Sequence, residues 1–269
     1  MLTDRIPKNR RGEALGYLGV AGNAGMASGP ALGSWLTVEW GIEWMFVASA
    51  LLGMASMLFT WPLEETLPGA RPVRSSDLNP FKGALIDPKA WPAAVVLLPV
   101  ALAFGVYLTI TPDFVDHLGY VYKGSFNTII VASSISMRFI AGRLSDRHGR
   151  IPMMLAGTLL LAMGMFLLGS AETKAMATIG GLVYGASIGI NMPTVFAWTA
   201  DLAQPGRIAV ALGTMLMALE IGIGCGAVAS GMHFQGDVGR LPELYYMSGV
   251  GALLTALALI PILLNGRKS

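Results

Sequence analysis

The residues best suited to chemistry in this chain are one charged cluster and two isolated polar positions. Residues 142–151, GRLSDRHGRI, place three arginines and an aspartate between two long apolar runs. A link this short predicts the turn of a helical hairpin, and its carboxylate can be stabilised by a helix N-terminus. Glu220 and Asn191 instead lie inside apolar runs. There a carboxyl can carry a proton, and an amide can bind a polar ligand.

The composition places these residues in a membrane protein. Hydrophobic residues make up 54% of the 269 residues and charged residues only 13%, whereas soluble domains have about 25% charged residues. The three histidines are scattered, and the one cysteine, Cys225, lies in an apolar run. We therefore expect no metal site, no cofactor and no internal disulfide. Because the sequence shows no phosphate loop or nucleophile elbow, we expect no enzyme, and nothing supports nucleic-acid binding.

Eight apolar windows, each near the length of about 20 residues that a spanning helix needs, predict eight transmembrane helices. They cover residues 14–38, 44–63, 90–112, 124–142, 151–171, 175–200, 208–231 and 244–264. The proline- and charge-rich stretch 64–89 is predicted to be a cytoplasmic linker between 1–63, with two spans, and 90–269, with six. Aromatic residues near the span ends are predicted to be interfacial anchors, namely Trp44, Trp61, Trp91, Tyr245 and Tyr246.

Basic residues predict the orientation of these spans. Fourteen of the eighteen lysines and arginines fall on one side and three on the other, while Arg138 lies within a span. The side with fourteen is predicted to be the cytoplasm, with both termini on it. Arg138 is near the cytoplasmic end of its span and is expected to reach the interface and pair with Asp146 or the rest of the charged cluster.

Glu220 and Asn191 both lie well inside predicted spans. Glu220 is 12 residues into its window, which is about 18 Å along a helix and near the middle of a hydrocarbon core of about 30 Å. We interpret it either as a proton-coupling or substrate-binding acid or as a neutral carboxyl hydrogen-bonded between helices. Asn191 is a candidate to line a cavity.

The charged cluster resembles the loop signature of the major facilitator superfamily of transporters, G-x-L-x-D-R-x-G-R followed by a basic residue. The matching positions are Gly142, Leu144, Asp146, Arg147, Gly149 and Arg150, and Ile151 replaces the final basic residue. The resemblance implies a loop that controls conformational change by latching two halves of a transporter together on the cytoplasmic side. It also implies that Asp146 lies close to the start of the first span, around residues 12–15.

The first span is similar to the helix 5 motif of the drug/proton antiporter branch, G-x-x-x-G-P-x-x-G-G. The matching positions are Gly25, Gly29, Pro30 and Gly33, and Ser34 replaces the last glycine. These glycines share one helix face, which permits close approach of a neighbouring helix, helix 8 in the family. The first and seventh spans also align at an offset of 197 residues, with glycines at 222 and 226. In two six-helix halves related by an axis along the membrane normal, this offset links helices 5 and 11.

The resemblance implies an all-α integral membrane protein whose eight spans are helices 5–12 of a twelve-helix fold, with helices 1–4 absent. It implies a secondary active transporter of a small organic molecule, by proton-coupled efflux through alternating access, in a bacterial inner membrane. In the family, helices 1, 4, 7 and 10 line the substrate path. An alternative therefore stays open, in which the chain is a transport-inactive relative that serves as an interaction or assembly subunit of a larger membrane complex. A membrane partner or a second copy would then replace helices 1–4.

Overall fold

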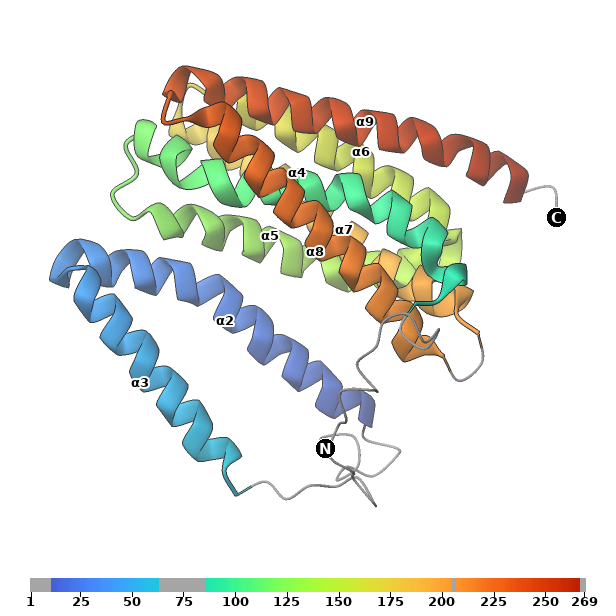
Figure 1. Ribbon diagram of the computed structural model, residues 1–269, viewed down its shortest axis with the longest axis horizontal. Helices are drawn as coiled ribbons and strands as arrows, with labels where there is room; N and C mark the ends of the chain where they lie inside the picture. Colours follow the sequence, from blue (N-terminus) through green and yellow to red (C-terminus); the bar gives the residue numbers. More distant parts are fainter. Residues whose placement is uncertain (1–10, 63–85, 205–206, 267–269) are drawn as a thin grey trace. The chain divides into compact units, whose positions relative to one another are not determined.

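The computed structural model describes residues 11–62, 86–204 and 207–266, and every regular element in these ranges is helical. Figure 1 shows eight α-helices: α2 (Arg11–Trp40), α3 (Ile42–Thr60), α4 (Trp91–His117), α5 (Lys123–His148), α6 (Arg150–Gly169), α7 (Lys174–Leu202), α8 (Ile208–Phe234) and α9 (Leu241–Gly266). Short 3-10 turns precede α4 and α9, at η3 (Pro88–Ala90) and η4 (Val238–Arg240). The predicted all-α fold with eight helices is confirmed, and the helices coincide closely with the apolar windows.

Within the described residues, six helical segments have the length and apolar composition of membrane spans. They are Ile42–Thr60, Pro88–His117, Arg150–Gly169, Lys174–Leu202, Ile208–Phe234 and Val238–Pro261. α2 and α5 are not among them, and α5 carries Arg138 as well as several serines. α3 has no buried residue, and its largest side chains, such as Phe59 at 82% exposure, present an apolar surface suited to lipid.

The described residues fall into two compact units, which we treat separately. The first combines α2 and α3 with residues 121–128 at the start of α5, and the second contains residues 86–120 and the remainder of the chain from residue 129. The predicted division into 1–63, 64–89 and 90–269 depends on a linker that lies almost wholly outside the described residues. That division stays a prediction.

The first unit is a helical hairpin with the start of α5 against it. Gly41 joins α2 to α3 at a φ of 100°, a conformation that favours glycine. Thr128 Oγ1 donates a hydrogen bond to the Ala27 carbonyl at 2.8 Å. The Tyr122 hydroxyl donates to Glu39 Oε1 at 2.7 Å. This hydrogen bond, which only the neutral phenol can donate, raises the pKa of Tyr122. The family expectation that helix 5 contacts helix 8 is therefore met by α2 and α5.

The second unit is held together by close helix pairs. α4 lies along α8 and also contacts α9, while α6 contacts both α7 and α9 (Figure 1). Glycines make the α4–α8 approach possible. A Cβ atom at Gly222 would stand 2.7 Å from the Leu98 carbonyl oxygen, one at Gly226 would meet the Leu102 carbonyl, and one at Gly105 would meet the backbone of α8. These two helices therefore touch backbone to backbone.

α5 and α6 approach α7 in the same way. Gly185 and Gly189 of α7 face the carbonyl oxygens of Ile130 and Ser134 on α5, and Gly164 of α6 lies against the backbone of α7. Small residues thus set the spacing between helices in the second unit. This is usual in membranes, where the hydrophobic effect does not drive helices together and close packing must do so.

Candidate functional site

The charged cluster forms the end of one helix and the beginning of the next. α5 continues through His148, the break is Gly149 alone, at a φ of 90°, and α6 begins at Arg150. The predicted turn between the two spans is therefore Gly149 alone, and the other residues expected in the link belong to α5 and α6. Arginine and leucine are good helix formers, so α5 carries its charged residues on extra turns beyond the apolar window. Glycine is the residue that the left-handed backbone requires.

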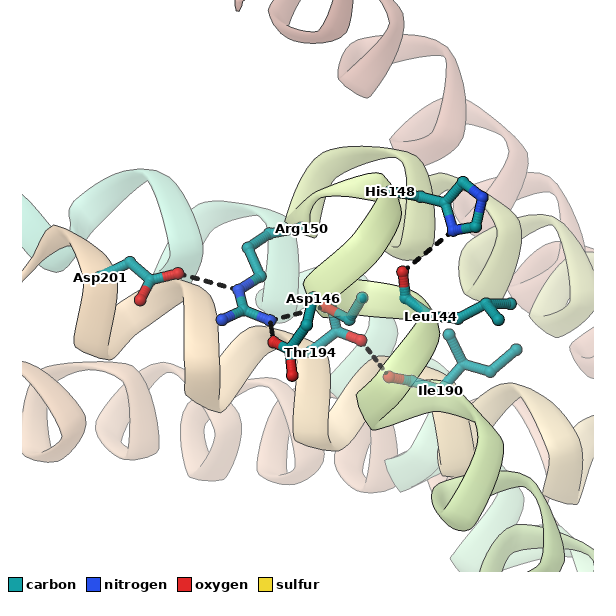
Figure 2. Close-up of polar contacts among 8 residues, drawn as sticks. Leu144, Asp146, His148, Arg150, Ile190, Thr194 and Asp201 are labelled. Carbon is teal, nitrogen blue, oxygen red and sulfur yellow. Dashed lines mark hydrogen bonds and ion pairs between the residues drawn. The ribbon is translucent and has the colours of Figure 1, made fainter.

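Arg150 connects three helices at this end of the unit, which we call the Gly149 end. Its Nε lies 2.8 Å from Asp201 Oδ2 at the end of α7, and its Nη1 lies 2.6 Å from Asp146 Oδ1 on α5. The same Nη1 donates to Ser145 Oγ at 3.0 Å. Figure 2 shows the guanidinium lying between the two carboxylates. We call Arg150, Asp146, Asp201 and Ser145 the Arg150 cluster.

The Arg150 cluster is exposed enough to open. The side chains of Asp146 and Asp201 are 71% and 55% exposed, and that of Arg150 is 24% exposed. Exposed ion pairs contribute about 0–1 kcal/mol each. The cluster therefore joins α5, α6 and α7 by contacts that contribute little free energy each. Sequence reasoning did not include Asp201, although its place directly after an apolar window was a usable signal.

The other residues of the signature lie outside this cluster. Gly142 has open space where a Cβ atom would stand, and Arg147 is exposed. Arg138, which was expected to pair with Asp146 or the rest of the charged cluster, is half-buried on α5, and the ion pair of Asp146 is with Arg150. The side chains at 12–15 lie outside the described residues, so the predicted approach of Asp146 to the first span stays a prediction.

Glu220 lies in the middle of α8 with its side chain exposed. At about 100° per residue it is turned roughly 160° away from Gly222, which faces α4. Among the residues that the structure describes, its carboxyl forms no hydrogen bond or ion pair. The interpretation of a carboxyl hydrogen-bonded between helices finds no support in this part of the chain, and the role in proton coupling stays a prediction.

Asn191 lies on α7 with no exposed surface. Its amide is pressed against α6, where a Cβ atom at Gly157 would meet Asn191 Oδ1. Within the described ranges neither Oδ1 nor Nδ2 has a hydrogen-bond partner, and an unsatisfied buried polar group costs about 1–3 kcal/mol. The structure thus places Asn191 between two helices, and its predicted place on a cavity wall remains to be tested.

The glycine face of α2 is open over part of its length. A Cβ atom at Gly25 or Gly29 would meet no described atom within 4 Å, and one at Gly33 would be 3.8 Å from Met45 Sδ. The close approach in this unit is at Pro30, whose carbonyl faces Gly124 of α5. A packing role for Gly25, Gly29 and Gly33 stays a prediction.

Comparison with known proteins identifies the source of these motifs. The sequence profile of the Major Facilitator Superfamily matches residues 1–227. The chain belongs to this superfamily. In its twelve-helix numbering α2–α9 are helices 5–12, and the chain is an integral membrane protein.

Three relatives illustrate the similarity within the superfamily. Multidrug resistance protein 1 of Bacillus subtilis (strain 168) is 30% identical over 58% of this chain and 40% of its own length. Inner membrane transport protein YdhP of Escherichia coli O157:H7 is 25% identical over 98% of this chain and 66% of its own length. Quinolone resistance protein NorA of Staphylococcus aureus (strain Mu50) is 21% identical over 61% of this chain and 42% of its own length. The chain therefore spans between 40% and 66% of the length of these relatives.

A tyrosine cluster between superfamily helices 7, 10 and 12 was not expected as a unit. The rings of Tyr107 on α4 and Tyr184 on α7 are 4.7 Å apart, and the Tyr245 hydroxyl on α9 is 3.0 Å from Thr111 Oγ1. Tyr184 and Tyr245 are fully buried, so the prediction of Tyr245 as an interfacial anchor is wrong. The position of Tyr245 near a span end suggested the anchor, but in the fold its ring packs edge-on to Phe114.

Proposed function

We propose that this protein is a secondary active transporter that moves small organic molecules out of the cell in exchange for protons. Membership of the superfamily supports transport, and the relatives named for multidrug and quinolone resistance support an organic substrate. The observation that carries the proton-coupling part is Glu220, a carboxyl near the midpoint of an apolar helix with no partner among the described residues.

The coupling follows from the solvation of this carboxyl. A charged side chain at the centre of a membrane costs about 2.5–3.5 kcal/mol on insertion scales, and more in simulations. The charged form of a carboxyl is therefore disfavoured in lipid and favoured where water reaches it. A carboxyl that binds a proton on one side of the membrane and releases it on the other performs the proton half of an antiport cycle.

The Arg150 cluster supplies the conformational control in this proposal. Asp146 and Asp201 bind the same guanidinium from different helices, so relative movement of α5 and α7 must break at least one contact. Because each exposed pair is worth about 1 kcal/mol or less, the cluster can open and close during a cycle. A bistable contact of this size biases a conformational equilibrium without locking it.

We place the Gly149 end and both termini in the cytoplasm of a bacterial inner membrane, which the distribution of basic residues supports. Cysteine labelling in a Cys225→Ser background tests this orientation. A membrane-impermeant maleimide should label Val121→Cys on intact cells and His148→Cys only after permeabilisation. Labelling of both positions on intact cells would overturn the orientation.

Transport is tested with the full chain in proteoliposomes that contain a pH-sensitive dye. A quinolone or ethidium, added across a proton gradient, should cause proton movement that Glu220→Gln abolishes. Glu243→Gln is the matched control, since Glu243 is an exposed carboxyl near a helix start that pairs with His233 at 2.9 Å. Unchanged movement in Glu220→Gln would remove the coupling role. A chain that moves neither compound, yet is isolated from native membranes in a stable complex, would favour an assembly subunit.

A further inference from the structure

The end of the second unit opposite the Gly149 end contains a pocket of about 650 Å³. It is lined by the end of α4, the end of α6 with the loop that follows, and η4 with the start of α9. Sites for drug-sized ligands have volumes of about 300–1,000 Å³. The pocket is therefore large enough for a molecule of that size, and it contains neither Glu220 nor any member of the Arg150 cluster.

The walls of this pocket are mainly apolar and aromatic. Phe114 of α4, which is 5% exposed, and Tyr246 of α9 contribute rings, and Leu118, Leu241 and Pro242 contribute aliphatic surface. Two of the polar groups, those of Ser170 and Tyr246, are hydrogen-bonded. Ser170 Oγ is 3.0 Å from the Tyr246 hydroxyl and donates to the Phe166 carbonyl at 2.8 Å. Such walls suit a ligand with an apolar body and one polar group.

Glu172 gives the pocket its charge. It is the one acidic residue among the lining residues, and these include no lysine or arginine. The lining also contains one histidine, His117. Neither Glu172 nor His117 forms a hydrogen bond or ion pair with another residue in the described part of the chain. The carboxylate is therefore available to a ligand.

Nearby cations are engaged elsewhere. Lys174 Nζ lies 5.4 Å above the centre of the Tyr120 ring. Arg240 Nε lies 3.3 Å from Asp237 Oδ2, and its Nη1 donates to the His233 carbonyl at 2.9 Å. Neither cation forms an ion pair with Glu172 in the described part of the chain, so the pocket combines aromatic walls with an unpaired carboxylate, and both features favour an organic cation.

We propose that this pocket binds an amphipathic monovalent organic cation, with its apolar groups against Phe114 and Tyr246 and its positive charge at Glu172. The inference concerns binding alone and does not depend on the proposed transport activity.

The test uses the full chain in lipid nanodiscs and two probes of nearly the same shape and opposite charge, tetraphenylphosphonium and tetraphenylborate. Saturable binding of each is measured by equilibrium dialysis. Tetraphenylphosphonium should bind more tightly than tetraphenylborate. Glu172→Gln should weaken the cation about fivefold, as expected for one partly exposed charge contact, and should not weaken the anion. Val238→Trp, which fills the pocket from η4, should weaken the cation at least as much as Glu172→Gln does.

The matched control is Glu243→Gln. Glu243 lies on the first turn of α9 near the pocket but does not line it, so its removal changes the local field without removing a contact. Cation affinity should change less in Glu243→Gln than in Glu172→Gln. The inference is overturned by equal binding of the two probes, by the absence of saturable cation binding, or by equal effects of the two glutamine variants. Because dialysis requires no flux, a failure of transport leaves this result interpretable.

Discussion

The α4–α8 contact gives a sharp test of the fold, through the substitution Gly226→Ala. The new Cβ atom would collide with the Leu102 carbonyl oxygen and would stand 3.1 Å from the Leu102 Cα atom. Both obstacles are helix backbone, which cannot turn aside as a flexible side chain can. To accept one methyl group, α4 and α8 must therefore separate.

The size of the effect follows from two opposing terms. Overpacking of a tight contact costs about 1–3 kcal/mol, while alanine gains about 1 kcal/mol over glycine in helix propensity. Gly224→Ala is the matched control, because Gly224 lies on the same helix with open space at the Cβ position. Propensity cancels between the two variants, so the difference in unfolding free energy should be about 1–3 kcal/mol. At about 2–4 °C per kcal/mol for a domain of this size, the midpoints should differ by about 2–12 °C.

The assay is the fraction of full chain that still elutes as a monodisperse peak on size exclusion after heating in one fixed lipid–detergent mixture. Gly226→Ala should have the lower midpoint and Gly224→Ala a midpoint at or above that of the unsubstituted chain. Equal midpoints for the two variants would refute the close approach of α4 and α8. That result would also remove the helix pairing on which the orientation of Glu220 rests.

Three further substitutions test individual contacts. Gly149→Ala places a Cβ atom in left-handed backbone and should cost about 1–2 kcal/mol in thermal stability, whereas Gly142→Ala, on a helix with open space, should cost nothing. Asp201→Asn removes one of the two ion pairs of Arg150 and should lower stability by less than about 1 kcal/mol. Because the turn is then held less tightly, a cysteine placed in the Gly149 turn should react faster with a maleimide. Because the hydrogen bond to Glu39 raises the pKa of Tyr122 above its usual 10.0, its stabilisation should be complete below pH 10 and lost as pH rises through the higher folded value. Tyr122→Phe should remove that part of the pH dependence of thermal stability.

Apolar windows predicted the helices well because a membrane-spanning helix requires a long stretch with few charged residues. The largest error was at the end of α5, which continues to His148 where the window ended at residue 142. Hydropathy marks where the hydrocarbon ends, but helix propensity and the next glycine decide where the helix ends. The isolated charge of Glu220 was also readable, since its window contains no other acidic residue and no lysine, arginine or histidine.

The sequence could not predict which side chains meet across helices. The offset of 197 residues aligned Gly222 and Gly226 with glycines of the first span, but it did not indicate that both pack on α4. The partnership of Asp201 with Arg150 depends on the relative rotation of α6 and α7, which a pattern of apolar residues leaves open. The burial of Tyr245 could not be predicted either, because it results from contact with α4 and not from the position of Tyr245 along its span.

The two faces of α8 connect these observations to the proposed proton coupling. Backbone contacts at Gly222 and Gly226 hold one face against α4, and Glu220 lies on the other. To bring Glu220 inward, α8 would have to rotate by roughly 160° and break those contacts, so α4 and α8 should move as a pair. The proposed proton coupling then depends on what reaches the outer face of α8. It follows that Gly226→Ala should lower thermal stability without shifting the pH dependence of flux, while Glu220→Gln should abolish that dependence at unchanged stability. A shift of the flux profile in Gly226→Ala would show that α8 turns against α4 during the cycle.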